Sequence, residues 1–107
     1  VDGFRIDALK HLPAGFIKDW LSAMRTHFSG RELFAVGEYW SADVNELHSY
    51  LTKVEGGTQL FDVPLHFRFL EASSQGESFD LTKIFEGSLV AENPLVAVTF
   101  VDNHDTE

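Results

Sequence analysis

The strongest strand signal in this sequence is the stretch 94–105, which reads PLVAVTFVDNHD. Residues 96–101 are mostly apolar and rich in β-branched side chains, as expected for a strand that is covered on both faces. The polar cluster 102–105 follows directly. In parallel α/β folds, ligands bind at the carboxyl ends of the strands. This stretch therefore indicates a buried strand whose end carries functional side chains.

Three earlier segments also predict strands that end in polar residues: the first alternates polar and apolar side chains, and the other two are short apolar runs. Strands are expected over 1–8, 33–36 and 60–63, with Pro64 closing the third. The polar residues at their ends are Asp7 for the first, Glu38 for the second, and Asp62 with His66 for the third. The recurrence suggests one site to which several strand ends contribute.

Two stripes of apolar residues predict helices between these strands. The first covers 16–24 and begins just after Pro13, a residue tolerated in a first helical turn. The second covers 44–54 and is stopped by the glycine pair 56–57. Strands that alternate with helices in this way predict an α/β fold with a parallel sheet.

The second half of the chain has weaker helical signals. The small polar segment 73–77 is expected to be a loop, and Asp80 can cap a third helix that Gly87 ends. The aromatic and sulfur-containing side chains expected in the cores of the helices are Phe16, Trp20, Met24 and Phe85.

Composition narrows the possible partners. With 44% hydrophobic and 23% charged residues among 107, the chain is globular in character. Seventeen acidic against eight basic residues give a formal charge of −9, which disfavours binding to nucleic acid or to an anionic membrane. No apolar run approaches the roughly 20 residues of a membrane helix. The sequence has no cysteine, so thiolate chemistry is excluded within it.

The first residue, Val1, already lies in an expected strand, so we expect the 107 residues to be an internal piece of a larger protein. Four parallel strands would leave two unpaired edges and an uncovered face. We therefore expect the segment alone to be inactive and prone to self-association. The sequence does not indicate whether the larger protein is cytoplasmic or secreted.

Three carboxylates at three strand ends, Asp7, Glu38 and Asp105, predict acid–base chemistry. Glycoside hydrolysis needs two carboxyl groups in different protonation states, one to protonate the leaving oxygen and one to attack or to activate water. Arg5, two residues before Asp7 on the same strand face, can keep that carboxylate ionised. Partial burial beside two aromatic residues, Tyr39 and Trp40, would favour a protonated Glu38.

These residues lie in motifs that resemble three consecutive signature regions of the α-amylase family of glycoside hydrolases. The motifs are GFRIDA at 3–8 with KH at 10–11, GEYW at 37–40, and FVDNHD at 100–105. Between them, FDVPLHF at 61–67 resembles the sixth-strand region of bacterial liquefying-type and cytoplasmic members. The resemblance implies one catalytic domain, an eight-stranded parallel (β/α) barrel, of which 1–107 would supply about strands four to seven.

The resemblance also implies a role for each site residue. Asp7 would be the nucleophile, Glu38 the general acid/base and Asp105 the transition-state stabiliser. The residues expected to bind substrate are Arg5, Lys10, Trp40 and His104. The backbone carbonyl of His11 would help to bind a structural calcium whose other ligands lie outside this segment. Asp62 and His66 are expected to support the loop and not to be catalytic.

The implied activity is endo-acting, retaining hydrolysis of α-1,4-glucosidic bonds in starch-type glucans, favoured by the 61–67 region and the triplet 38–40. Related transglycosylases, pullulan-cleaving enzymes, α-glucosidases and branching enzymes share the catalytic trio. Two alternatives belong to other classes. One is a two-metal hydrolase, with ligands drawn from Asp7, His11, Glu38, Asp102, His104 and Asp105. The other is a catalytically dead carbohydrate-binding relative, although such relatives usually lose a catalytic acid.

Overall fold

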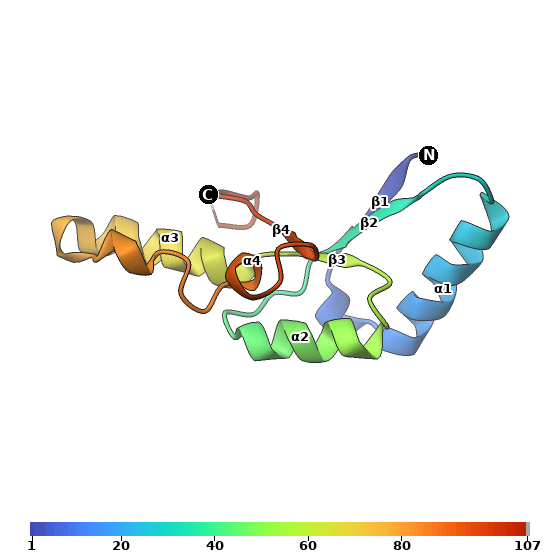
Figure 1. The fold of residues 1–107 in the computed structure, drawn as a ribbon, viewed down its shortest axis with the longest axis horizontal. Coiled ribbons are helices and arrows are strands. Elements are labelled where there is room, and N and C mark those ends of the chain that lie inside the picture. The colour runs from blue at the N-terminus through green and yellow to red at the C-terminus, as the bar shows by residue number, and fades with distance from the viewer. Residues whose placement is uncertain (107) are drawn as a thin grey trace.

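A computed structural model describes residues 1–106 of the chain. The strands are β1 (Gly3–Ile6), β2 (Phe34–Gly37), β3 (Gln59–Phe61) and β4 (Ala97–Val98), and the α-helices are α1 (Ala14–His27), α2 (Val44–Lys53), α3 (Val63–Gln75) and α4 (Leu89–Glu92). Short 3₁₀ helices are η1 (Leu9–His11), η2 (Gly76–Ser78) and η3 (Leu81–Lys83). Figure 1 shows α1 and α2 on one side of the strands, with α3 extending away from them.

The four strands form one parallel sheet in the order β1-β2-β3-β4. β1 and β2 pair over four residues, from Gly3 opposite Phe34 to Ile6 opposite Gly37. The pairs β2–β3 and β3–β4 extend over two residues each. This parallel pairing confirms the expected α/β fold with a parallel sheet. As a consequence, the polar residues that follow the strands all lie at the same edge.

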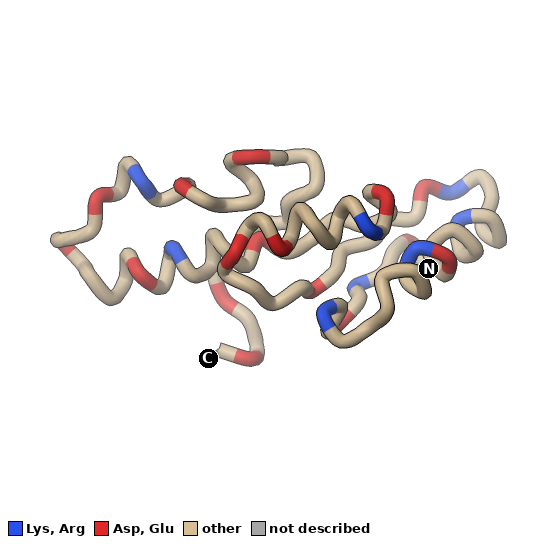
Figure 2. Tube along the Cα trace, turned by 90° about the horizontal axis from the view of Figure 1, so that it is seen from below, with Lys and Arg blue, Asp and Glu red and all other residues tan. Residues whose placement is uncertain are grey.

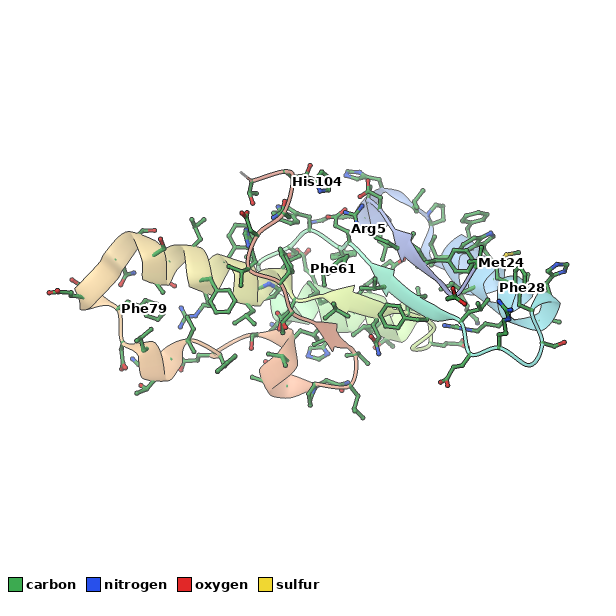
Figure 3. All side chains as sticks on the ribbon, turned by 90° about the horizontal axis from the view of Figure 1, so that it is seen from above. Arg5, Met24, Phe28, Phe61, Phe79 and His104 are labelled. Carbon is green, nitrogen blue, oxygen red and sulfur yellow. The ribbon has the colours of Figure 1, made fainter. Side chains whose placement is uncertain are left out.

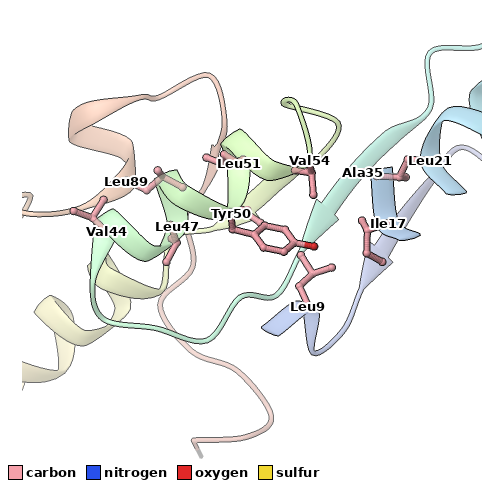
Figure 4. Packing of buried hydrophobic residues seen from close by; sticks show 11 residues of the cluster. Leu9, Ile17, Leu21, Ala35, Val44, Leu47, Tyr50, Leu51, Val54 and Leu89 are labelled. Carbon is pink, nitrogen blue, oxygen red and sulfur yellow. The ribbon is translucent and has the colours of Figure 1, made fainter. Parts of the chain in front are cut away.

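The hydrophobic core lies between the sheet and the helices α1 and α2 (Figure 4). All four residues of the expected α2 stripe are buried: Val44, Leu47, Leu51 and Val54. Asp43 caps this helix by accepting a hydrogen bond from the Asn45 backbone N–H at 2.9 Å. The 3.6-residue period therefore identified both the helix and its buried face.

The α1 stripe is only partly buried. Ile17 and Leu21 are 2% exposed and face the sheet, and Trp20 packs the edge of its ring on Phe4, with the centroids 4.9 Å apart. The expectation that Phe16 lies in the core is wrong, because it is 58% exposed. Adjacent residues on a helix point about 100° apart, so the helix face that buries Ile17 turns Phe16 away.

The segment after β3 differs most from the sequence-based expectation. Pro64 does not close a strand; it lies in the first turn of α3, which Asp62 caps by accepting from the Leu65 N–H at 3.1 Å. Proline suits this position because its missing N–H has no helical partner there. The helix continues to Gln75, so the expected loop at 73–77 is wrong for its first three residues.

Two further expectations change in the last third of the chain. Asp80 does act as a cap, but it begins the single 3₁₀ turn η3, and Phe85 beyond it is 54% exposed. The strand expected over 96–101 is only the two-residue β4. β3 ends where α3 begins, so the Asp62 N–H bonded to the Val98 carbonyl at 2.9 Å is the last rung available to β4.

Charged residues of both signs are distributed along the chain (Figure 2). Within residues 1–106, no helix has the length and apolar character needed to cross a bilayer.

Candidate active site

A hollow of about 230 Å³ lies at the carboxyl ends of the strands. Its lining residues are Arg5, Glu38, Trp40, Phe61, Phe100, Asp102, Asn103, His104 and Asp105. They follow or belong to β1, β2, β3 and β4, so residues far apart in sequence meet because their strands are parallel. Figure 3 shows Arg5, Phe61 and His104 near one another in the middle of the molecule, with Phe79 at the distant end of α3.

The first side of the hollow is built by β1 and β2. Arg5 projects from β1, and its Nη1 is 3.0 Å from Asp7 Oδ1. The same guanidinium lies over the Phe61 ring, 5.9 Å from the centroid. Glu38 is half-buried and accepts a hydrogen bond on Oε2 from the Ala8 N–H at 2.7 Å. This side therefore combines an ion-paired carboxylate with one held by a backbone donor.

The second side is the C-terminal loop, residues 99–106, which carries His104 and Asp105. Both side chains are exposed, and His104 Nε2 lies 3.5 Å from Asp105 Oδ1. The Asp105 N–H donates to Asn103 Oδ1 at 2.8 Å, and Asn103 Nδ2 donates to Thr106 Oγ1 at 2.8 Å. Local hydrogen bonds therefore shape the loop but leave its imidazole and carboxylate open to a ligand.

Aromatic rings join the two sides. His66 stacks on Phe100 with the ring centroids 5.0 Å apart and an interplanar angle of 13°. Trp40 lies beside both, 5.7 Å from His66 and 6.5 Å from Phe100 between centroids. The indole is half-buried and lines the hollow, so it offers a flat apolar surface to a ligand next to the carboxylates.

Asp62 and His66 support this arrangement, as expected from the sequence. Asp62 is 0% exposed, and its carboxylate accepts from the Leu65, Leu89 and Val90 N–H groups at 3.1, 3.0 and 2.7 Å. It thereby joins the start of α3 to α4. His66 Nδ1 is 2.9 Å from the Val101 carbonyl oxygen, which ties α3 to the C-terminal loop.

The structure brings together five of the expected site residues in the lining of the hollow: Arg5, Glu38, Trp40, His104 and Asp105. Asp7 is outside that lining but contacts it through Arg5. Lys10 is also outside, because its ammonium group pairs with Glu46 at 3.2 Å and lies over the Tyr39 ring.

Three lining residues were not identified as site residues from the sequence, Phe61, Phe100 and Asn103, and a fourth, Asp102, was named only as a ligand in the two-metal alternative. Asp102 and Asn103 belong to the polar cluster after the last expected strand, so their position was a usable signal. Phe61 and Phe100 carry no such signal, because an aromatic residue in an apolar run is read as core.

Within residues 1–106, no group of three His, Asp or Glu side chains lies close enough together to hold a metal ion. His11 is exposed and belongs to η1, which follows directly after the turn at Ala8.

Comparison with known proteins gives the family. The chain is 51% identical over 107 residues to an α-amylase of Geobacillus stearothermophilus and 47% identical over 107 residues to one of Bacillus licheniformis. It is 50% identical over 106 residues to the cytoplasmic α-amylase of Escherichia coli (strain K12). These matches cover 99–100% of this chain but 19–21% of each relative. No family model matches the chain.

These residues belong to the α-amylase family. The α-amylases are glycoside hydrolases, and the chain spans about a fifth of the length of the curated relatives it matches. A cyclomaltodextrin glucanotransferase of Bacillus sp. (strain 38-2) is more distant, at 34% identity over 114 residues and 15% of its length. The parallel sheet of this segment is compatible with part of a barrel.

Proposed function

We propose that the protein containing these residues hydrolyses internal α-1,4-glucosidic bonds of starch- or glycogen-type glucans with retention of configuration. One observation carries the proposal: Arg5, Glu38, Trp40 and Asp105 line one hollow, with Asp7 paired to that Arg5. Carboxylates beside an aromatic wall suit a sugar, because hydroxyl groups need acceptors and the apolar ring face needs a flat surface. The α-amylase relatives support the same substrate class.

The reaction assigns a step to each carboxyl group. Asp7 attacks the anomeric carbon while Glu38 gives its proton to the glycosidic oxygen, so the C–O bond breaks and a glycosyl ester forms. Water then attacks that carbon while Glu38, now a carboxylate, takes a proton from the water. Asp7 leaves as a carboxylate. The Arg5 guanidinium, 3.0 Å from Asp7 Oδ1, pairs with this carboxylate and orients it. Asp105 stabilises the positive charge that develops on the sugar ring.

Four further residues are proposed to bind the glucan. Trp40 stacks on a sugar face, and His104 donates to hydroxyl groups from its exposed position beside Asp105. Arg5 acts from within the hollow. Lys10 must leave Glu46 or reach past Tyr39 to contact a hydroxyl, since it is engaged with both in this structure.

The larger architecture is part of the proposal. We place 1–107 as strands four to seven of one catalytic eight-stranded (β/α) barrel, because parallel pairing in sequence order continues across the whole sheet. A structural calcium would bind the His11 carbonyl, since a backbone oxygen is a normal calcium ligand and no described hydrogen bond from residues 1–106 occupies it. Its remaining ligands would come from outside this segment.

Transglycosylation is the second candidate, favoured by the likeness to cyclomaltodextrin glucanotransferases. The same glycosyl ester would form, but a sugar hydroxyl in place of water would attack it. Product analysis with a labelled oligosaccharide acceptor distinguishes the two: hydrolysis gives shorter chains only, whereas transfer gives the labelled acceptor extended by glucose units.

Chelation tests the two-metal hydrolase. With a metal-bound nucleophile, removal of metal abolishes turnover of the still-folded enzyme, whereas the carboxylate mechanism survives until calcium loss unfolds the protein. If the intact parent protein, without chelation, had no activity on starch, it would instead be the catalytically dead relative.

The retaining mechanism is tested by proton NMR on the complete parent protein. We expect the first product to be the α-anomer, appearing before mutarotation mixes the two forms. A β-anomer as the initial product would contradict the assignment of Asp7 as nucleophile, because a single displacement by water inverts the configuration.

A further inference from the structure

The Glu38 carboxylate is held by a backbone group of the segment that carries Asp7. The Ala8 N–H donates to Glu38 Oε2 at 2.7 Å. Two backbone hydrogen bonds flank this contact: Glu38 N–H donates to the Ile6 carbonyl at 2.8 Å, and Leu9 N–H donates to the Glu38 carbonyl at 2.9 Å. Asp7 therefore lies between two residues that are bonded to Glu38, so the two carboxylates share one rigid backbone frame.

Ala8 makes this contact from an unusual backbone conformation. Its φ of 52° and ψ of 42° lie in the left-handed region, which residues with a Cβ rarely occupy. Such conformations persist where the surrounding structure holds them, and they gather at functional sites. At Ala8 the chain turns away from the direction of β1 and enters η1. The Ala8 N–H faces the Glu38 side chain.

Packing beneath the turn holds it in place. Leu9 is 0% exposed and fills the space beside Gly37, the residue before Glu38. A Cβ at position 37 would lie 2.0 Å from Leu9 Cδ1, so only glycine allows this approach. The strained turn is therefore stabilised by a buried leucine, and its closeness to Glu38 depends on a missing side chain on β2.

We propose that Ala8 is a positioning residue for the general acid. Its N–H binds Oε2, so the transferable proton of Glu38 is carried on Oε1 and faces the glycosidic oxygen. As the proton leaves, Glu38 becomes charged and the hydrogen bond strengthens, since charge-assisted hydrogen bonds are the stronger ones. The contact thus stabilises the transition state more than the ground state. This inference rests on the proposed role of Glu38.

The test uses the complete parent enzyme and two substrates that differ in leaving group. A maltooligosaccharide needs a proton on its leaving oxygen, whereas an α-maltosyl fluoride does not. We expect Ala8→Val, whose branched side chain resists the left-handed backbone, to lower kcat/KM on the maltooligosaccharide about 10- to 100-fold. On the fluoride, kcat/KM stays within about threefold of the unmodified enzyme.

Two variants at the same position separate the hydrogen bond from general damage. Glycine adopts a left-handed backbone without strain. We therefore expect Ala8→Gly to keep the ratio of kcat/KM on the maltooligosaccharide to kcat/KM on the fluoride near that of the unmodified enzyme. An ester at position 8, with oxygen in place of the amide N–H and the methyl group retained, removes only the donor. We expect it to reproduce the Ala8→Val ratio, which keeps the test valid if the valine variant fails to fold.

A matched control exists elsewhere in the chain. Glu55 also has a φ of 52°, but it follows α2 and pairs with Lys18. Glu55→Val imposes the same backbone strain away from the hollow, and it should leave the ratio unchanged. Equal losses on both substrates for Ala8→Val and for the ester variant, or no loss in either of them, would overturn the proposal.

Glu38→Gln separates this inference from the proposed function. If Glu38→Gln spares the fluoride but Ala8→Val and the ester variant do not, only the positioning role fails. If Glu38→Gln shows no dependence on the leaving group, the acid role itself fails.

Discussion

The two sides of the hollow are built in different ways. The β1–β2 junction (residues 6–9 and 37–38) is fixed by four residue pairs of strand register, by two backbone hydrogen bonds of Glu38 and by the hydrogen bond that its carboxylate accepts from the Ala8 N–H. The C-terminal loop follows a strand of two residues, and its Asp105 is 61% exposed. The β1–β2 junction is therefore positioned by strand pairing between residues of this chain, whereas the C-terminal loop depends on a few side-chain contacts.

The difference separates two chemical tasks. A nucleophile and an acid must keep a fixed distance, since a misplacement of about 1 Å can cost about a hundredfold in rate. Paired strands supply that rigidity. A group that stabilises charge and binds hydroxyls must follow a substrate that changes shape, and a loop suits this role. We therefore expect changes in the junction to affect kcat most, and changes in the loop support to act more weakly.

The largest effect is expected from the junction carboxylates. Asp7→Asn removes the nucleophile and Glu38→Gln removes the proton, so each should lower kcat on starch by about 10²- to 10⁴-fold or more, with the fold intact. Steady-state kinetics and circular dichroism of the parent enzyme measure both. Asp19→Asn, an exposed position on α1, is the matched control and should change neither.

Retained activity in Asp7→Asn would remove the nucleophile assignment.

The second effect concerns Asp62, the buried carboxylate that joins α3 to α4. Asp62→Ala leaves three N–H groups of α3 and α4 without an acceptor, so the free energy of unfolding should fall by about 3 kcal/mol. Urea denaturation of the parent protein, followed by tryptophan fluorescence, measures the change. Asp43→Ala removes an exposed cap from α2 and should cost about 1 kcal/mol. Equal losses for the two variants would contradict the special role of Asp62.

The loop itself is tested through His66. His66→Phe preserves a ring that can stack on Phe100 but removes the hydrogen bond to the Val101 carbonyl. We expect kcat to fall about tenfold, the size of one lost hydrogen bond, because the loop that carries Asp105 is held less firmly. His27→Phe, on the exposed end of α1, should have no effect. An unchanged kcat in His66→Phe would mean that the loop is positioned by other contacts.

The smallest effect lies outside both regions. Hydrogen bonds from the Thr82 hydroxyl at 2.7 Å and the Thr82 N–H at 3.0 Å lower the pKa of Asp80 below its ordinary value. The stabilisation by this cap is therefore present above the ordinary pKa, and it is lost as the pH falls through the lowered pKa. Carbon-13 NMR titration of the Asp80 carboxyl measures the midpoint. Thr82→Val should raise that pKa, and a midpoint that does not move would contradict the assigned cause.

Much of the first half of the fold was predictable from sequence, because its signals are local. The α2 stripe, the alternating segment that contains β1 and the short apolar run of β2 each occupy a few consecutive residues. Strand–helix alternation then indicated a parallel sheet, which gathers polar strand ends at one edge. Asp7, Glu38 and Asp105 could be proposed as one site on that basis.

The second half shows where local signals fail. Pro64 was interpreted as the end of a strand, although Asp62 before it supplies the cap that lets proline begin α3. The two readings differ only in whether the Asp62 carboxylate finds N–H groups nearby, two of which lie on α4, 27 and 28 residues away. β4 was expected to be long because its sequence favours strands, but its partner β3 ends after three residues.

By itself, the sequence determined the order of the strands, the helices α1 and α2, the buried face of α2 and the carboxylates that end the strands, since each depends on residues adjacent along the chain. Only the tertiary structure decided that Ala8 is left-handed and that its N–H meets Glu38, 30 residues away. The physical reason is that this conformation is unfavourable for alanine alone. It exists because Leu9 is buried against Gly37, a contact that forms only when β1 and β2 are paired.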